Sequence, residues 1–162
     1  MDPILLLVPH VALSLIGIAF GFVLMRDFLQ ARFRASVVWI FLVSTTLTSL
    51  TGYLFSRDQV LPSHVVGAIS LLVLLPTWLA WRPYRLAGGW RTTFVIGAAI
   101  SQWLNVFVLV AQLFQKVPAL HALAPTGSEP PFGIAEGLVL LAFIAATFVA
   151  WRRNRVTPVR FQ

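Results

Sequence analysis

The chain has 162 residues, of which 59% are hydrophobic and only 10% are charged. A soluble domain usually carries about a quarter charged residues, so this composition excludes a soluble globular domain. The absence of cysteine also excludes disulfides, thiolate metal sites and a cysteine nucleophile. The net charge is +7, and its meaning depends on where the basic residues lie along the chain.

Five apolar runs are each long enough to cross the hydrocarbon core of a bilayer, which takes about 20 residues. In chain order they are Ile4–Met25, Ser36–Phe55, Pro62–Trp81, Thr92–Phe114 and Phe132–Trp151. They predict an all-α integral membrane bundle of five transmembrane helices, organised as one transmembrane domain over residues 1–162. The residues before the first run lack the basic segment of a signal peptide, so we expect this run to stay in the membrane.

Basic residues lie almost entirely in alternate connecting segments. On one side of the predicted membrane are Arg26, Arg32, Arg34, Arg82, Arg85, Arg91, Arg152, Arg153, Arg155 and Arg160, whereas the other side has only Arg57 and Lys116. The positive-inside rule then predicts an external N-terminus and a cytoplasmic C-terminus. Tryptophan prefers the membrane boundary, and the predicted cytoplasmic boundary holds Trp39, Trp78, Trp81, Trp90 and Trp151. We interpret the positive charge as contact with anionic lipid headgroups and not as a nucleic-acid site.

The longest connection is the predicted external loop, residues 115–131, in which we expect one turn of helix at Ala119–Leu123. Small residues recur at a spacing of four within the spans. The pairs are Gly17 and Gly21, Gly97 and Ser101, and Gly133 and Gly137, followed by Ala142, Ala146 and Ala150. In lipid this spacing allows helices to approach closely, which predicts a compact bundle and a possible homo-oligomer.

Polar residues inside the spans recur at one depth. With a rise of about 1.5 Å per residue, each span places one polar side chain about 20–26 Å above the cytoplasmic boundary: His10, Thr51, His64, Asn105 and Glu136. Gln102, Asn105 and Gln112 share one face of the fourth span, and the second span adds the hydroxyl of Thr48. This polar layer has two interpretations, hydrogen bonds that pair the helices or a polar pathway through them.

His10 and His64 suggest the most specific chemistry. Two imidazoles on facing helices can be the axial ligands of one haem b iron. The same two histidines with Glu136 could instead form a metal or proton site, and each histidine could equally bond a loop carbonyl. Glu136 could carry protons, or could simply favour the N-terminus of its helix through the helix dipole.

Three segments carry a resemblance. They are LPSHVVGAISLLVLL (Leu61–Leu75), LNVFVLVAQLFQKVPAL (Leu104–Leu120) and SEPPF (Ser128–Phe132). They resemble a group of small bacterial inner-membrane proteins without an assigned activity. The positions of His10 and His64 are also similar to those in a broader class of small bacterial membrane domains, which have a histidine near the start of two helices. The resemblance implies a location and draws attention to the histidines, but it implies no substrate or reaction.

No nucleophile-elbow, phosphate-loop, dinucleotide, zinc-protease or kinase motif occurs. We therefore expect a small multi-pass inner-membrane protein without catalytic apparatus, acting as an accessory or structural subunit. The alternatives are a b-type haem electron carrier that uses His10 and His64, and a proton or small-solute pathway through Glu136 and the amides of the fourth span.

Overall fold

The computed structural model describes residues 3–55 and 62–156, and this part of the chain contains helices and no strand. The helices are α1 (Pro3–Leu29), α2 (Ala35–Gly52), α3 (Pro62–Trp81), α4 (Trp90–Lys116), α5 (Pro118–His121) and α6 (Pro130–Val156). All except the four-residue α5 are long and apolar enough to cross a membrane. The predicted all-α fold with five candidate spans is thus confirmed, and α5 is the helical turn expected in the long loop.

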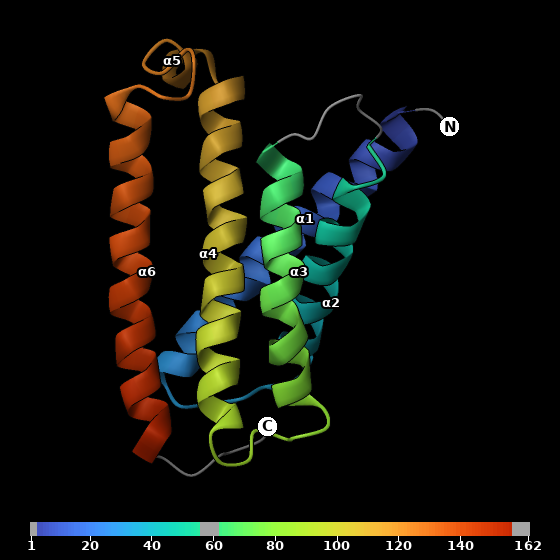
Figure 1. Cartoon of the computed structure of the whole chain (residues 1–162), viewed down its shortest axis with the longest axis vertical. Helices are drawn as coiled ribbons and strands as arrows, with labels where there is room; N and C mark the ends of the chain where they lie inside the picture. The colour runs from blue at the N-terminus through green and yellow to red at the C-terminus, as the bar shows by residue number, and fades with distance from the viewer. Residues whose placement is uncertain (1–2, 56–61, 157–162) are drawn as a thin grey trace.

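Four of the long helices form a ring, and α6 stands outside it (Figure 1). Within the ring, α1 and α3 each contact α2 and α4, while α6 contacts α4 and α1. In Figure 1, α1 crosses behind its neighbours on a diagonal, so that it approaches α6 only near its own C-terminal end. Because the five long helices run up and down in turn, α1 begins at one end of the bundle and α6 finishes at the other (Figure 1).

The best-packed part of the bundle is the end at which α1 finishes and α2 begins. The rings of Phe28, Phe33 and Phe94 lie 5.7–6.1 Å apart, centre to centre, and all three are at most 1% exposed. Trp81 stacks on Phe94 at 5.5 Å. Aromatic clusters of this kind bury a large apolar area, so this one holds α1, α3, α4 and the turn between α1 and α2 together at this end.

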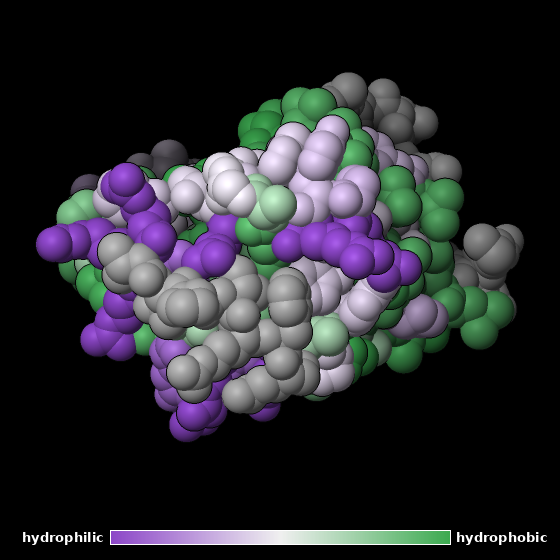
Figure 2. Space-filling model, turned by 90° about the horizontal axis from the view of Figure 1, so that it is seen from below, coloured by the Kyte–Doolittle hydropathy of each residue, from purple (hydrophilic) through white to green (hydrophobic). Residues whose placement is uncertain are grey.

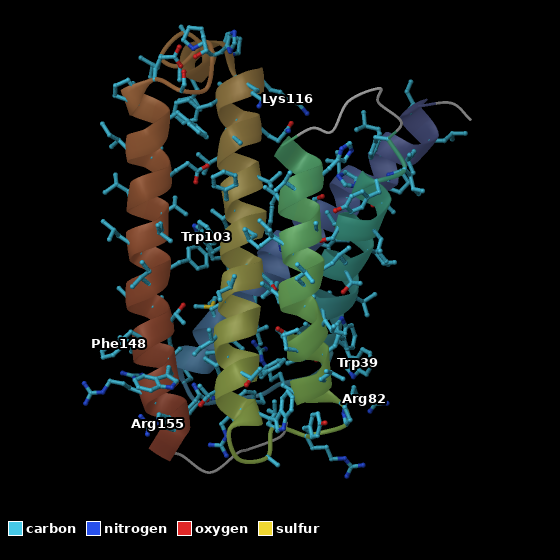
Figure 3. All side chains as sticks on the ribbon, in the orientation of Figure 1. Trp39, Arg82, Trp103, Lys116, Phe148 and Arg155 are labelled. Atoms are coloured by element: carbon cyan, nitrogen blue, oxygen red, sulfur yellow. The ribbon has the colours of Figure 1, made fainter. Side chains whose placement is uncertain are left out.

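The same end carries nearly all of the positive charge, and we call it the basic end. The described arginines gathered there are Arg26, Arg32, Arg34, Arg82, Arg85, Arg91, Arg152, Arg153 and Arg155. Hydrophilic side chains crowd the view onto this end in Figure 2. In Figure 3, Arg82 and Arg155 lie at the end opposite Lys116. This agrees with the predicted sorting of charge, although Arg57 and Arg160 lie outside the described residues.

Polar side chains tie the last helix to the first at the basic end. Asn154 Nδ2 donates hydrogen bonds to the carbonyl oxygens of Phe28, at 2.7 Å, and Ala150, at 2.8 Å. Arg153 donates to the carbonyl oxygen of Leu29, and Arg91 donates to that of Asn154 at 2.7 Å. These bonds were not predicted from the sequence. Those to Phe28 and Leu29 fix α6 against the end of α1, and the bond from Arg91 fixes it against the start of α4.

The turn between α1 and α2 contains the one salt bridge found among the described residues. Arg34 donates two hydrogen bonds to the buried carboxylate of Asp27, at 2.8 and 2.9 Å. Hydrogen bonding to Asp27 raises the pKa of the Arg34 guanidinium above its ordinary value. A paired arrangement of this kind is what a carboxylate needs when it is removed from water.

Glycines of the ring lie close to side chains of neighbouring helices, whereas glycines of α6 do not. A Cβ added at Gly21 would lie 1.8 Å from Gln102 Oε1, and one at Gly97 would lie 2.1 Å from Thr77 Oγ1. Gly17 similarly faces the hydroxyls of Ser44 and Thr45. The predicted close approach of helices is therefore confirmed for these glycines. A Cβ at Gly133 or Gly137, on α6, would have no neighbour within 4 Å.

Candidate functional site

The amides of α4 lie against α1 and α2. Gln102 is 1% exposed, and its Nε2 donates to the carbonyl oxygen of Ile18 on α1 at 2.9 Å. Asn105 Nδ2 donates to Thr45 Oγ1 on α2 at 3.2 Å. Gln112 is half-buried further along the helix. Two of the three amides in the predicted stripe thus bond to neighbouring helices.

Three side-chain oxygens of α2 and α4 are buried and have no hydrogen-bond partner among residues 3–55 and 62–156. They are Gln102 Oε1, Ser101 Oγ and Thr48 Oγ1. A buried acceptor or hydroxyl without a partner is unfavourable in an apolar medium. Polar groups within α2 and α4 are therefore not all satisfied by the contacts between the described helices.

His10 contacts the outer end of α2, which is the end away from the basic end. Its Nδ1 lies 2.8 Å from Thr51 Oγ1, and its ring meets the edge of Phe55 at 5.1 Å. The Thr51 hydroxyl can also donate its hydrogen to the carbonyl oxygen of Leu47 at 2.8 Å. Which of the two atoms donates in the His10–Thr51 bond depends on the tautomer of the imidazole. His10 and Thr51, both predicted in the polar layer, are therefore brought together.

His64 contacts a different side of α2. Its ring stacks on Tyr53 at 5.6 Å, and its carbonyl oxygen accepts a hydrogen bond from the Tyr53 hydroxyl at 2.6 Å. Tyr53 follows Thr51 by two residues in helical geometry, and such residues point to roughly opposite sides of a helix. In this arrangement the outer end of α2 lies between His10 and His64. The bis-histidine haem site remains a prediction.

Glu136 lies in a different interface. It follows Phe132 by one helical turn, and the Phe132 ring meets Phe114 of α4 at 5.5 Å, so Glu136 is on the side of α6 that faces α4. Both carboxylate oxygens are buried and have no hydrogen-bond partner in the part of the chain that the structure describes. The polar layer predicted at one depth is thus divided between the interior of the ring and the α4–α6 interface.

Trp103 is the second unsatisfied polar group of that interface. Its side chain projects from α4 towards α6 (Figure 3), and its Nε1 is buried without an acceptor among the described side chains. An indole N–H usually finds a partner when it is buried. The interface between α4 and α6 therefore contains a donor and a carboxyl group that the described contacts leave unsatisfied.

The residues predicted as a metal site do not form one cluster. Within residues 3–55 and 62–156, no group of three or more His, Cys, Asp or Glu side chains is placed to hold a metal ion. His10 and His64 contact α2, whereas Glu136 belongs to the interface between α4 and α6. A metal site that uses all three would require rearrangement of two interfaces.

The loop before α6 has its own ordered carboxylate. Glu129 accepts hydrogen bonds from the backbone N–H groups of Thr126 and Ser128, each at 3.1 Å, and from the Thr126 hydroxyl at 2.9 Å. Loss of surrounding water alone would raise the pKa of Glu129, but these hydrogen bonds outweigh it and hold the pKa below its ordinary value. Sequence reasoning missed this residue, although the Thr-Gly-Ser-Glu turn is a pattern that favours such bonds.

No family model, curated protein or solved structure matches the chain.

Proposed function

We propose that this chain is a non-catalytic accessory or structural subunit of the bacterial inner membrane, with its N-terminus outside and its C-terminus in the cytoplasm. Positive charge on one end of the bundle supports the orientation, and the resemblance of the segments around His64, Asn105 and Ser128 supports the location. The apolar surface of the five long helices suits a protein that is surrounded by lipid and by other membrane helices.

One observation carries the structural interpretation: polar side chains within the spans connect neighbouring helices. His10 bonds to Thr51 and joins α1 to α2, while Gln102 joins α4 to α1. Trp78 donates to Thr46 at 3.0 Å and joins α3 to α2. In lipid, hydrogen bonds between helices replace the hydrophobic driving force that is available in water. The intramembrane polar groups of the ring therefore act mainly in packing.

The orientation can be tested with single cysteines, because the natural chain has none. A Ser128→Cys variant is expected to react with a membrane-impermeant maleimide in intact cells. The matched control, Arg85→Cys at the basic end, is expected to react only after the membrane is opened. The reverse pattern would show that the orientation is wrong.

The subunit role is tested by extracting the chain from its native membrane in polymer-bounded discs. We expect discs in which the chain is present in a fixed ratio with a second membrane protein or with a second copy. Discs that contain one copy of the 18.0 kDa chain and no other protein in a fixed ratio would contradict the proposal.

A second candidate function is a proton pathway through Glu136 and the amides of α4. The observation that favours it is the unpartnered carboxyl group of Glu136, because intramembrane ionisable groups commonly mark proton relays. Proton flux into liposomes should then fall strongly in Glu136→Gln. Glu129→Gln is the matched control, since it removes a carboxyl group outside the membrane. Equal flux in all three proteins would exclude this function.

A further inference from the structure

The interface between α4 and α6 contains a groove of about 340 Å³ that is lined almost entirely by apolar side chains. On α4 its wall includes Ile100 and Trp103, and on α6 it includes Ile144, Phe148 and Trp151. The one hydroxyl in the wall is that of Thr147. Because an unfilled gap loses dispersion contacts along its whole lining, this groove requires an apolar occupant in the membrane.

The length of the groove matches one leaflet. Along α6 the lining residues run from Leu140 to Trp151, which is about 16 Å at 1.5 Å per residue. Half of a hydrocarbon core about 30 Å thick has nearly the same extent. The groove also lies in the half of α6 nearer the basic end, where the lining finishes at a boundary tryptophan.

Positive charge lies at the mouth of the groove. The guanidinium of Arg152 is 5.8 Å from the centre of the Phe148 ring, and that of Arg155 is 4.7 Å from the Trp151 ring. Both rings belong to the groove wall. Neither arginine has a salt bridge to a described carboxylate, since the one such bridge joins Arg34 to Asp27. Cation–π contacts leave the N–H groups at the edge of a guanidinium available to phosphate oxygens.

From this combination we infer that the α4–α6 groove binds one anionic phospholipid of the leaflet at the basic end. An acyl chain lies between α4 and α6, and the phosphate is bound by Arg152 and Arg155. An apolar helix of another protein would satisfy the groove but not the two cations. The inference needs only that the chain spans a membrane, so it is independent of the subunit role.

The test is native mass spectrometry of the full chain in detergent, with phosphatidylglycerol or phosphatidylcholine added at equal concentration. We expect the natural chain to retain one phosphatidylglycerol at least fivefold more often than one phosphatidylcholine. Arg152→Gln combined with Arg155→Gln should remove this preference. The control pair Arg26→Gln and Arg32→Gln, two exposed arginines at the same end but outside the groove, should keep it.

A second pair of variants tests the groove itself. Ile144→Trp adds a ring inside the groove at a side chain that is 56% exposed, so it should reduce lipid retention at least fivefold without unfolding the protein. Leu141→Trp, at a 64% exposed side chain of the same helix outside the groove, should retain lipid normally. The melting temperature of each variant verifies that it is folded.

If one of these variants unfolds, a photoactivatable phosphatidylglycerol on the natural chain decides the question. Crosslinks confined to α4 and α6 support the inference. Crosslinks spread over all the helices, equal retention by Ile144→Trp and Leu141→Trp, or a second protein in place of the lipid would overturn it.

Discussion

α4 and α6 are two helices of 27 residues whose most apolar stretches are almost equally hydrophobic. Half of that stretch is buried in α4, whereas none of it is buried in α6. The two helices differ in what interrupts the apolar sequence. α4 presents Gln102 and Asn105 to its neighbours, whereas the glycines of α6 face open space. Hydropathy therefore assigns a helix to lipid, but polar and small residues decide whether it becomes central or peripheral.

The largest expected effect distinguishes a glycine beside α4 from one on α6. In Gly21→Ala the new methyl group would occupy the position of the Gln102 amide, which must shift although it is buried and bonded to Ile18. Overpacking of this kind destabilises a protein by about 1–3 kcal/mol. Gly137→Ala meets no neighbour and should be neutral, or stabilising by up to about 1 kcal/mol through helix propensity. Unfolding in mixed micelles with increasing SDS measures both changes.

An equal loss of stability in the two alanine variants would show that α6 is as tightly enclosed as α4. That result would contradict the difference in packing between the two helices. A higher stability in Gly137→Ala together with a lower stability in Gly21→Ala would confirm that difference.

A smaller effect tests the polar stripe within α4. Asn105→Leu removes the hydrogen bond to Thr45 and should lower the free energy of unfolding by about 0.6 kcal/mol, the average for such bonds in membranes. Gln112→Leu, which changes a half-buried amide on the same face, should leave it nearly unchanged. If Gln112→Leu lowers the free energy of unfolding as much as Asn105→Leu does, or more, then the hydrogen bond from Asn105 to Thr45 is not what holds α4 in the ring.

The smallest effect concerns the loop that joins α4 to α6. The folded state lowers the pKa of Glu129 below 4.5, so its contribution to stability is complete above pH 4.5 and disappears as the pH falls through the folded value. Glu129→Gln should remove this part of the acid dependence and shift the melting temperature only slightly at neutral pH. Melting curves between pH 3 and pH 7 provide the measurement. An unchanged acid dependence would show that the loop contributes nothing to the position of α6.

The five long helices could be predicted because each needs only an uninterrupted apolar run. Their ends were less predictable: α1 continues from Met25 to Leu29, since Asp27 is paired with Arg34 and can be buried. The polar residues of the spans were identified from the sequence, but their partners were not. Counting residues along each helix predicts that His10 and His64 lie at a similar height. It does not predict which neighbouring helix each side chain contacts, and both contact the end of α2.

The position of Glu136 shows the same limit. Its height was predicted, but whether it faces the ring or a peripheral interface depends on how α6 is attached. Asn154 and Arg153 attach α6 to the end of α1. In the sequence these residues belong to a basic segment that indicates only which end of the bundle is cytoplasmic. Side-chain bonds to backbone carbonyls leave no periodic pattern, so they could not be anticipated.

Those bonds to Phe28 and Leu29 have a consequence for how the chain is made. The last carbonyl groups of a helix have no partner within the helix. At the end of the first helix, the carbonyl oxygen of Leu29 accepts from Arg153 of the last helix, and that of Phe28, which already accepts from the Ala31 N–H, accepts a second hydrogen bond from Asn154. The turn after α1 supplies backbone partners for the carbonyls of Asp27 and Phe28 at once, but the two side-chain bonds from α6 can form only after the other long helices have been synthesised. A chain truncated after Ala150 would contain most of every apolar segment and still lack both of the bonds that connect its two ends.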